Sequence, residues 1–323
     1  MTAAGGALLR VQDFSAGYVT GGGTVLAVHK VSFDLAAGEF LGIAGESGCG
    51  KSTLAFGITG LLQPPGRVLG GQVFFEGQDL TSVGPEDLRR MRWKEFSIVF
   101  QASMNVLNPV MKVKDQIFDA MIAHGVLDRR RLHARAVELF RLVNLPPRFL
   151  DAYPHQLSGG MRQRVAIAAA LALEPKLVIM DEPTTALDVV VQRTILQEID
   201  ELRRRLAFSV IFITHDLSLL VEVSDSVAIM YAGSLVERAP SRGLYAMPLH
   251  PYTQGLMQAF PPLTGTRRRL HGIAGQPPDL GRPIGGCPFE PRCSRRVQGL
   301  CERVTPPLRQ IEPGHWVACH LYG

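Results

Sequence analysis

One short stretch, residues 45–53 with the sequence Gly-Glu-Ser-Gly-Cys-Gly-Lys-Ser-Thr, constrains the fold of this 323-residue chain more than any other. It matches the pattern G-x-x-x-x-G-K-[ST] at every fixed position. Residues 39–44 before it read as a short buried strand, and residues 53–58 read as the start of a helix. Glycines let such a loop wrap a phosphate chain with backbone N–H groups, and the helix N-terminus adds partial positive charge. The sequence therefore predicts that Lys51 reaches the outer phosphates and that Ser52 holds Mg²⁺.

Composition narrows the class of protein. The chain is 46% hydrophobic and 20% charged, which is ordinary for a globular protein. Its longest apolar run, residues 165–173, has nine residues, about half of the roughly 18 that a membrane helix needs. The first residues lack a charged segment followed by an apolar core, so we expect no signal peptide. The net charge of +5 is spread along the chain, and solvated helix faces explain it at least as well as a nucleic acid partner does.

Apolar strand patterns alternate with helical patterns along the rest of the chain. Residues 8–40 and 70–80 alternate between apolar and polar positions, which predicts antiparallel β structure. Residues 111–150 show helical spacing and are expected to lie in an inserted helical subdomain at about 102–165. Three largely apolar runs, at 96–100, 177–181 and 209–213, read as buried strands. The second is fully apolar up to its final carboxylates, which is typical of a central parallel strand. The predicted fold class is α/β, with a mostly parallel core sheet and an antiparallel β subdomain.

Polar side chains follow each of the three apolar runs. Gln101 ends the first run and can contact Mg²⁺ and an attacking water. Asp181 and Glu182 end the second, where Asp181 suits an acidic Mg²⁺ partner and Glu182 can deprotonate water. His215 follows the third run and can sense the γ-phosphate. Alone, Gln101 would be unremarkable, a histidine such as His215 is more often structural, and a solvated strand end is the alternative for the two carboxylates. The shared position of these residues after buried strands favours the functional interpretation.

Two further features suit nucleotide contacts. Ser158 is a good N-cap for a strong helical run at 165–172, and Gly159 and Gly160 at that helix N-terminus make a second phosphate cradle. Tyr18 lies 27 residues before Gly45, where an aromatic ring can stack on adenine. A strand aromatic packed in the core is an equally good interpretation of Tyr18 from spacing alone.

The order of these motifs resembles that of ABC-type ATPases, the nucleotide-binding subunits of ABC transporters. The matching elements span residues 9–239: Tyr18 for adenine stacking, Walker A at 45–53, the Q-loop Gln101, the signature at 157–161, Walker B with the catalytic glutamate at 177–182, the D-loop at 186–188 and the switch His215. Met161 departs from the commonest family residue, glutamine, but Ser158, Gly159 and Gly160 are intact.

The resemblance implies an ATPase with the P-loop NTPase fold and with ATP and Mg²⁺ as ligands. Its catalytic residues would be Glu182 as general base, His215, Gln101 and Lys51. Mg²⁺ would be held by Ser52, Gln101 and Asp181. The nucleotide-binding positions would be Tyr18, Gly45, Ser47, Gly48, Cys49, Gly50, Lys51, Ser52, Thr53, Gln101, Ser158, Gly159, Gly160 and Asp181.

The resemblance also implies partners. Two ATPase subunits would face each other head to tail, with each ATP between the Walker A motif of one chain and the signature of the other. Two transmembrane permease subunits would be driven through the segment after Gln101, and no nucleic acid partner is implied. The chain would lie at the cytoplasmic face of the membrane as a peripheral subunit.

A narrower resemblance points to the dipeptide, oligopeptide and nickel importer branch. It rests on residues 157–164 and 181–189 and on the tail sequences at 250–253, 275–278 and 287–293. This branch implies import of di- or oligopeptides delivered by an extracytoplasmic solute-binding protein. Nickel or another small solute is an alternative cargo. A soluble, non-transport ABC ATPase is a second alternative, but such proteins usually carry two cassettes or a long coiled-coil insertion, which this chain lacks.

Four of the five cysteines fall in the last 37 residues, at Cys287, Cys293, Cys301 and Cys319. We expect an ATPase domain at 1–240 and a C-terminal extension at 241–323 whose Pro- and Gly-rich cysteine segment has little regular structure. Disulfides do not suit a reducing cytosol, and zinc usually shows tighter C-x2-4-C pairs, although His315 and His320 are spare ligands. A four-cysteine cluster tolerates wide spacing, and similar tails in some peptide-importer ATPases carry [4Fe–4S], which is the favoured interpretation over zinc or free thiols. Because the segment lies outside every nucleotide motif, we expect it to be separate from the nucleotide site.

Overall fold

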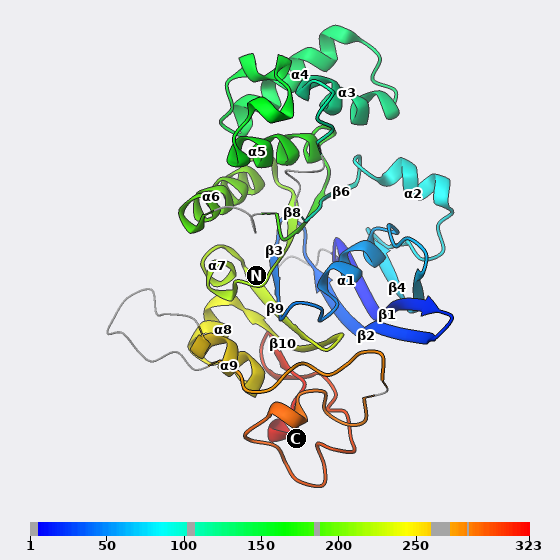
Figure 1. The fold of residues 1–323 in the computed structure, drawn as a ribbon, viewed down its shortest axis with the longest axis vertical. Coiled ribbons are helices and arrows are strands. Elements are labelled where there is room, and N and C mark those ends of the chain that lie inside the picture. The colour runs from blue at the N-terminus through cyan, green and yellow to red at the C-terminus, as the bar shows by residue number, and fades with distance from the viewer. Residues whose placement is uncertain (1–5, 102–106, 184–187, 260–271, 283) are drawn as a thin grey trace. The chain divides into compact units, whose positions relative to one another are not determined.

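The computed structural model describes residues 6–101, 107–183, 188–259, 272–282 and 284–323 (Figure 1). The chain divides into two compact units. The first contains residues 1–35, 41–81 and 214–323, and the second contains residues 36–40 and 82–213. The expected boundary at residue 240 runs inside the first unit and stays a prediction. In the described part of the chain, no helix has the length and apolar character needed to span a bilayer.

An antiparallel sheet forms one part of the first unit. Its strands are β1 (Leu9–Thr20), β2 (Gly23–Leu35), β4 (Gly66–Phe75) and β5 (Gln78–Asp79), in the order β2-β1-β4-β5. In β1, Leu9, Val11 and Phe14 are buried, whereas the residues between them are exposed. This alternation is the pattern that predicted β structure, and the predicted antiparallel subdomain is confirmed.

The remaining strands of the first unit follow the order β11-β12-β10-β9-β3. They are β3 (Phe40–Ala44), β9 (Ser226–Tyr231), β10 (Ser234–Pro240), β11 (Arg309–Glu312) and β12 (His315–Val317). β3 and β9 are parallel, and β9 and β10 form a hairpin that turns at Gly233, whose φ of +82° suits glycine. β12 pairs with β10, so the cysteine segment, expected to have little regular structure, contributes the two short strands β11 and β12 to the sheet.

Helices of the first unit flank these strands. They are α1 (Lys51–Ile58), α7 (Leu217–Val223), α8 (Ser241–Ala246) and α9 (Pro251–Ala259), with short 3-10 turns at η4 (Glu290–Arg292) and η5 (His320–Tyr322). Asp216 caps α7, because its carboxylate accepts from the backbone N–H groups of Ser218 and Leu219 at 3.0 and 3.3 Å.

The second unit combines a short parallel sheet with helices, five of which lie in its described residues. Its strands are β6 (Phe96–Val99), β7 (Leu177–Asp181) and β8 (Ser209–Thr214), with β6 and β8 on either side of β7. All residues of these strands are buried, as their apolar sequences predicted. The helices are α2 (Pro85–Met91), α3 (Val113–Ala123), α4 (Arg129–Leu142), α5 (Gly159–Ala170) and α6 (Val189–Leu206), with 3-10 turns at η2 (Pro147–Asp151) and η3 (Pro154–Gln156).

The helical part of the second unit has its own apolar core. α3 buries Ile117 and α4 buries Leu139 and Phe140. The Arg135 side chain of α4 donates to the carbonyl oxygens of Leu171 and Ala172 at 3.0 and 3.1 Å, just after α5. Those carbonyls lie at a helix C-terminus, where a cation is favoured. The contact therefore joins α4 to the end of α5.

A buried carboxylate fastens the C-terminal segment to the first unit. Glu237 of β10 is fully buried and accepts from the backbone N–H groups of Leu249 and His250 at 2.7 and 2.9 Å. His315 of β12 is hydrogen-bonded to the same carboxylate at 2.7 Å. Because these three partners compensate the buried carboxylate, removing any one of them would lower the stability of the fold. The network holds β10, the residues before α9 and β12 together.

The neighbouring His250 generates a prediction about stability and pH. Burial lowers the pKa of His250 to about 4, below its ordinary 6.5. As pH falls from 6.5 to 4, the unfolded chain takes up a proton at this position and the folded chain does not. We therefore expect the free energy of unfolding to be highest above pH 6.5 and to fall through this window, by about 3 kcal/mol at most.

The measurement is urea unfolding at pH 7 and pH 5. In the wild type, the backbone N–H of Tyr252 donates to His250 Nδ1 at 3.0 Å. His250→Gln removes the titrating group and keeps an acceptor for this N–H. The variant should lose less stability than the wild type between the two pH values. Equal losses would contradict the prediction.

Candidate functional site

The loop between β3 and α1 is shaped by close backbone approaches. A Cβ atom on Gly50 would lie 2.1 Å from the carbonyl oxygen of Ala27, and one on Gly45 would lie 2.2 Å from that of Met230. Gly50 also has a φ of +100°, a conformation that L side chains rarely adopt. Glycine at these two positions is therefore required by β2 and β9 passing next to the loop.

Lys51 carries a buried charge at the start of α1. The residue is 5% exposed, and its Nζ atom donates to the carbonyl oxygens of Gly45 and Glu46 at 2.8 and 3.0 Å. The loop therefore encloses the ammonium group where phosphate oxygens are expected to bind. Cys49 is also buried, and burial raises the pKa of its thiol, which fits a small packing residue.

Tyr18 lies beside this loop rather than in the core. It is half-buried at the end of β1, and its hydroxyl is 3.1 Å from the hydroxyl of Thr53 in α1. The contact connects the antiparallel sheet to the helix that follows the loop. Part of the ring remains accessible, and stacking on adenine stays a prediction.

In the second unit, the ends of two neighbouring strands bring two predicted site residues together. Gln101 follows β6, Glu182 follows β7, and the Gln101 Nε2 atom donates to Glu182 Oε2 at 3.2 Å. Glu182 has a φ of +43°, and its backbone N–H donates to the carbonyl oxygen of Ile213 at 2.9 Å. The preceding residue, Asp181, is fully buried as the last residue of β7. The backbone therefore turns sharply between a buried and an accessible carboxylate.

The predicted signature residues lie at the N-terminus of α5. Ser158 caps the helix, because its hydroxyl accepts from the backbone N–H of Met161 at 3.3 Å, which confirms the predicted cap. Ser158 is exposed and Gly160 is half-buried. Arg164 of α5 forms a bidentate ion pair with Glu198 of α6, at 2.7 and 3.0 Å, which the sequence did not predict. The pair sets the position of α5 against α6.

The other two predicted elements are described in part. His215 is exposed directly after β8 and belongs to the first unit. Of the D-loop, residues 186 and 187 lie outside the described residues. Asp188 caps α6 by accepting from the backbone N–H of Val191 at 3.0 Å.

The structure also shows a contact with the phosphate loop that sequence reasoning missed. Arg292, next to Cys293, donates to both carboxylate oxygens of Glu46 at 2.7 and 3.0 Å. Glu46 is the second residue of the motif at 45–53. The expectation that the cysteine segment is separate from the nucleotide motifs is therefore wrong. The only sequence signal was a glutamate inside the motif and an arginine inside the cysteine segment, and nothing in their spacing of 246 residues pairs them.

The four cysteines of the C-terminal segment lie near one another. Burial raises the pKa of the Cys287 thiol to about 11, and the neighbouring Cys301, Cys319 and Cys293 add to the rise. The backbone N–H of Cys287 donates to the carbonyl oxygen of Cys301 at 2.7 Å. Within the described ranges, however, no three His, Cys, Asp or Glu side chains converge as ligands of one metal ion.

Backbone N–H groups point at these thiols. Cys301 Sγ accepts from the N–H of Val297 at 3.3 Å. The thiols of Cys287, Cys293 and Cys319 are hydrogen-bonded by the backbone of the residue two positions later in each case, which opposes the rise in pKa. Such donors stabilise anionic sulfur.

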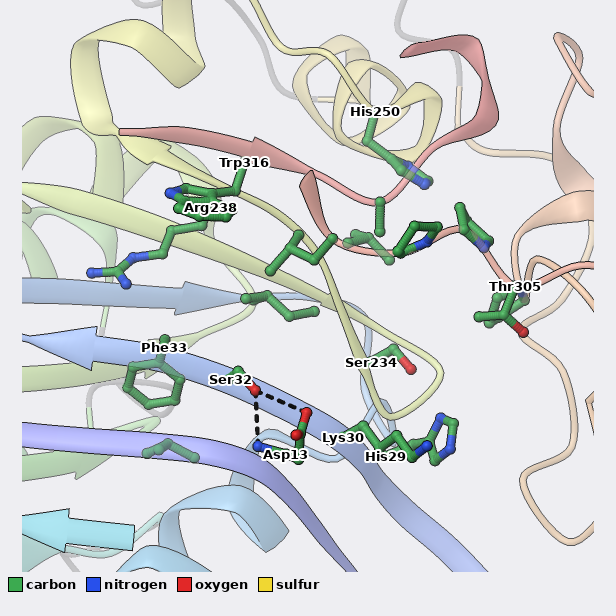
Figure 2. A pocket seen from close by; sticks show the side chains of 18 of the residues that line it. Asp13, His29, Lys30, Ser32, Phe33, Ser234, Arg238, His250, Thr305 and Trp316 are labelled. Atoms are coloured by element: carbon green, nitrogen blue, oxygen red, sulfur yellow. Dashed lines mark hydrogen bonds between the residues drawn. The ribbon is translucent and has the colours of Figure 1, made fainter. Parts of the chain in front are cut away.

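A cavity of about 1220 Å³ lies against the same segment in the first unit. Residues of β1 and β2 form one side, and Cys287 and Phe289 contribute to another. Figure 2 shows Asp13 and Ser32 in this cavity, where the Ser32 hydroxyl donates to the Asp13 carboxylate at 3.3 Å. At its rim Arg10 pairs with Asp34 at 3.0 Å. The two carboxylates are therefore held by groups of the protein itself.

Comparison with known proteins places the chain in a family. A family model described as ABC transporter matches residues 28–185, and one described as the oligopeptide/dipeptide transporter C-terminal region matches residues 236–301. The dipeptide transport ATP-binding protein DppD of Caldanaerobacter subterraneus is 42% identical over 317 residues, which cover 98% of this chain and 97% of the relative. The oligopeptide transport ATP-binding protein OppD of Escherichia coli is 41% identical over 97% of this chain and 93% of its own length. The chain belongs to the ABC transporter family.

Solved structures agree with this assignment. A bacterial ABC transporter cassette described as dimeric is 28% identical, with a TM-score of 0.66 over 73% of this chain and 99% of the cassette. The protein cbiO1 of Clostridium perfringens, part of an ABC transporter complex, is 26% identical, with a TM-score of 0.66 over 75% of this chain and 92% of its own. The predicted α/β class with the ABC ATPase fold is confirmed, and the roles of the individual site residues stay predictions.

The glycines of the loop give a direct test of its geometry. Gly50→Ala would place a Cβ 2.1 Å from the Ala27 carbonyl oxygen at a left-handed φ, so we expect a lower melting temperature and at least about tenfold weaker ATP binding, since such strain costs about 1–3 kcal/mol. Gly48→Ala is the matched control, because its φ is +79° but nothing lies within 4 Å of the added Cβ. Its loss of stability should be smaller. Equal effects, measured by thermal unfolding and nucleotide titration, would show that the close approach of β2 is unimportant.

Proposed function

We propose that this ABC transporter subunit hydrolyses ATP to power the import of dipeptides or oligopeptides across the cytoplasmic membrane. The observation that carries the cargo class is identity of about two fifths, over nearly the whole chain, to relatives named for dipeptide and oligopeptide transport. The match to a peptide-transporter C-terminal region adds support from a part of the chain outside the nucleotide motifs.

The donor chemistry of the predicted residues suits Mg-ATP. Ser52 brings a hydroxyl at the N-terminus of α1, and Asp181 brings a buried carboxylate, which are oxygen ligands of the kind that Mg²⁺ prefers. When bound, Mg²⁺ neutralises developing charge on the phosphates. Lys51 binds the outer phosphates and orients them. Glu182 accepts the proton of the attacking water, and Gln101 holds the Glu182 side chain by the hydrogen bond between them.

The partners follow from the family. ABC ATPase cassettes work as dimers with membrane permease subunits, and one solved neighbour is described as dimeric. We propose a head-to-tail pair in which Ser158 and Gly160 contact the ATP held by the partner chain. The exposure of Ser158 at a helix N-terminus supports this contact, because such a position is open to an anionic ligand. The further proposals are an extracytoplasmic solute-binding protein and a peripheral place at the cytoplasmic face.

The cargo is tested on the assembled transporter. The complex is purified through a tag on this chain, its subunits are identified by mass spectrometry, and ATPase activity is measured in liposomes with the binding protein and either peptides or nickel. Stimulation by di- or oligopeptides is expected. Stimulation by nickel alone, or co-purification with ribosomes or DNA in place of permeases, would overturn the proposal.

Glu182 is tested by removing its basicity. Glu182→Gln keeps the shape of the side chain and the partner of Gln101, so we expect Mg-ATP binding to persist while turnover falls about 10²–10⁴-fold, or roughly 3–5 kcal/mol. The measurement compares steady-state ATPase rates and nucleotide affinity in the assembled complex. Glu198→Gln, in the ion pair with Arg164, removes a carboxylate elsewhere in the same unit and serves as the control. A Glu182→Gln rate near that of the wild type would exclude Glu182 as the base.

We further propose that Cys287, Cys293, Cys301 and Cys319 hold a [4Fe–4S] cluster. The proximity of the four thiols, together with the backbone N–H groups directed at them, supports anionic sulfur ligands. Metal loading would deprotonate thiols whose pKa is raised by burial, so it releases protons. The cluster would supply a stable centre for a segment that is poor in apolar core.

The cluster is tested by colour and metal content. Protein purified without oxygen should be brown and contain iron and sulfide, and Cys293→Ser should lose both because a four-cysteine cluster loses a ligand. Cys49→Ser changes the one cysteine outside the segment and should keep the iron. Stoichiometric zinc without iron in the anaerobic wild type would overturn the cluster.

A further inference from the structure

Arg292 is the centre of a contact between the cysteine segment and the phosphate loop. Its side chain is 5% exposed and forms the bidentate pair with Glu46 described above. The same guanidinium donates to the carbonyl oxygens of Ala274 and Ile273 at 2.9 and 3.3 Å and to the hydroxyl of Tyr231 at 3.3 Å. Planar, forked geometry of this kind is specific to arginine. Arg292 is therefore held in one orientation from several sides.

Glu46 is fixed at three places, each with a different partner. Its carboxylate meets Arg292, its backbone N–H donates to the hydroxyl of Tyr252 at 2.9 Å, and its carbonyl oxygen accepts from Lys51 Nζ at 3.0 Å. Two of the three partners come from the C-terminal part of the chain. The third is the lysine expected to bind phosphate. A displacement of Glu46 therefore moves an acceptor of Lys51.

Aromatic side chains pack around the contact between Arg292 and Glu46. Tyr231, Tyr252 and Phe289 contact one another, with ring centroids 4.6 to 5.4 Å apart. The Arg292 guanidinium lies 5.8 Å from the Tyr231 ring centroid and 6.0 Å from that of Phe289. Phe289 and Arg292 both belong to the stretch between Cys287 and Cys293. The cysteine segment thus packs against β9, α9 and the phosphate loop together.

Charge gives the pair a second consequence. Glu46 places a carboxylate, 26% exposed, in a loop expected to bind a polyanion. The ion pair raises the pKa of Arg292 above its already high value, so the arginine stays charged and compensates that carboxylate. Without Arg292, a partly buried negative charge would remain beside the bound phosphates.

We propose that Arg292 is a positioning residue for nucleotide binding: it holds and neutralises Glu46, and so couples the order of the cysteine segment to the shape of the phosphate loop. The coupling is reciprocal: if an ordered cysteine segment raises the affinity for nucleotide, bound nucleotide must in turn order the segment. This inference rests on the proposed role of residues 45–53 in phosphate binding. It does not depend on which metal, if any, the cysteines hold.

The first test measures ATP affinity and turnover in the full-length protein within the transporter complex. Arg292→Met should raise the ATP Kd and KM about tenfold while kcat at saturating ATP changes by less than about threefold, since the residue acts on binding and does not touch the reacting atoms. Arg292→Lys should have a Kd between those of Arg292→Met and the wild type, because lysine keeps the positive charge but cannot form the bidentate pair. Arg296→Ala is the matched control: it breaks an ion pair with Glu290 at 2.9 Å in the same segment, away from the loop, and should leave the Kd unchanged.

A double variant separates charge from general loss of packing. Glu46→Gln removes the carboxylate that Arg292 compensates, so Arg292→Met/Glu46→Gln should bind ATP more tightly than Arg292→Met alone. A purely structural role for Arg292 would give no such rescue. If Arg292→Met fails to fold, Arg292→Gln, which also removes the charge, and its combination with Glu46→Gln carry the same comparison.

The reciprocal effect is read by hydrogen exchange. Mg-ATP should slow amide exchange across residues 287–293 in the wild type and in Arg296→Ala, and should do so much less in Arg292→Lys. Lys51→Ala separates a failure of the proposed phosphate-binding role of the loop from a failure of the proposed role of Arg292. If Lys51→Ala still binds ATP like the wild type, the proposed role of the loop fails. If Lys51→Ala loses binding while the Arg292 variants keep wild-type affinity, or if ATP leaves residues 287–293 unaffected, the inference about Arg292 is overturned.

Discussion

The buried ammonium group of Lys51 is the charge around which the first unit is organised. It lies inside a loop whose own carbonyl oxygens receive it, and that loop keeps its path because backbone carbonyls of β2 and β9 leave no space for side chains at Gly50 and Gly45. The strands, the loop and α1 therefore form one mechanical unit, and a change in either strand is transmitted to the lysine.

The second unit places two neighbouring carboxylates in different surroundings, one buried and one more accessible. Asp181 ends a fully buried strand, whereas Glu182 turns out of it with a positive φ and meets Gln101. Adjacent parallel strands make this possible, because their C-terminal ends lie at the same edge of the sheet. α5 carries the signature residues at its N-terminus and is held by Arg135 and by the Arg164–Glu198 pair. The exposed Ser158 is thus supported by a helix with fixed neighbours.

The C-terminal segment is joined to the ATPase fold by polar contacts more than by a core of its own. Glu237 gathers β10, β12 and the residues before α9, and Arg292 reaches the phosphate loop. Each contact buries charge that is compensated on several sides, which makes the loss of one partner expensive. This arrangement explains how a segment rich in proline and glycine is ordered next to the loop at residues 45–53.

The sequence by itself determined the family, the parallel and antiparallel strands, the inserted helices and the candidate nucleotide residues, because these depend on local periodicity and on motifs with fixed spacing. It also indicated that Gln101, Asp181 and His215 follow strands at one edge of the sheet, whereas the hydrogen bond between Gln101 and Glu182 came from the structure. Only the tertiary structure decided that β12 joins β10, that Arg164 pairs with Glu198 and that Arg292 holds Glu46. Those pairs join residues up to 246 positions apart in sequence, and charged side chains carry no local pattern that names a distant partner. Which charge meets which is settled by the packing of the chain as a whole.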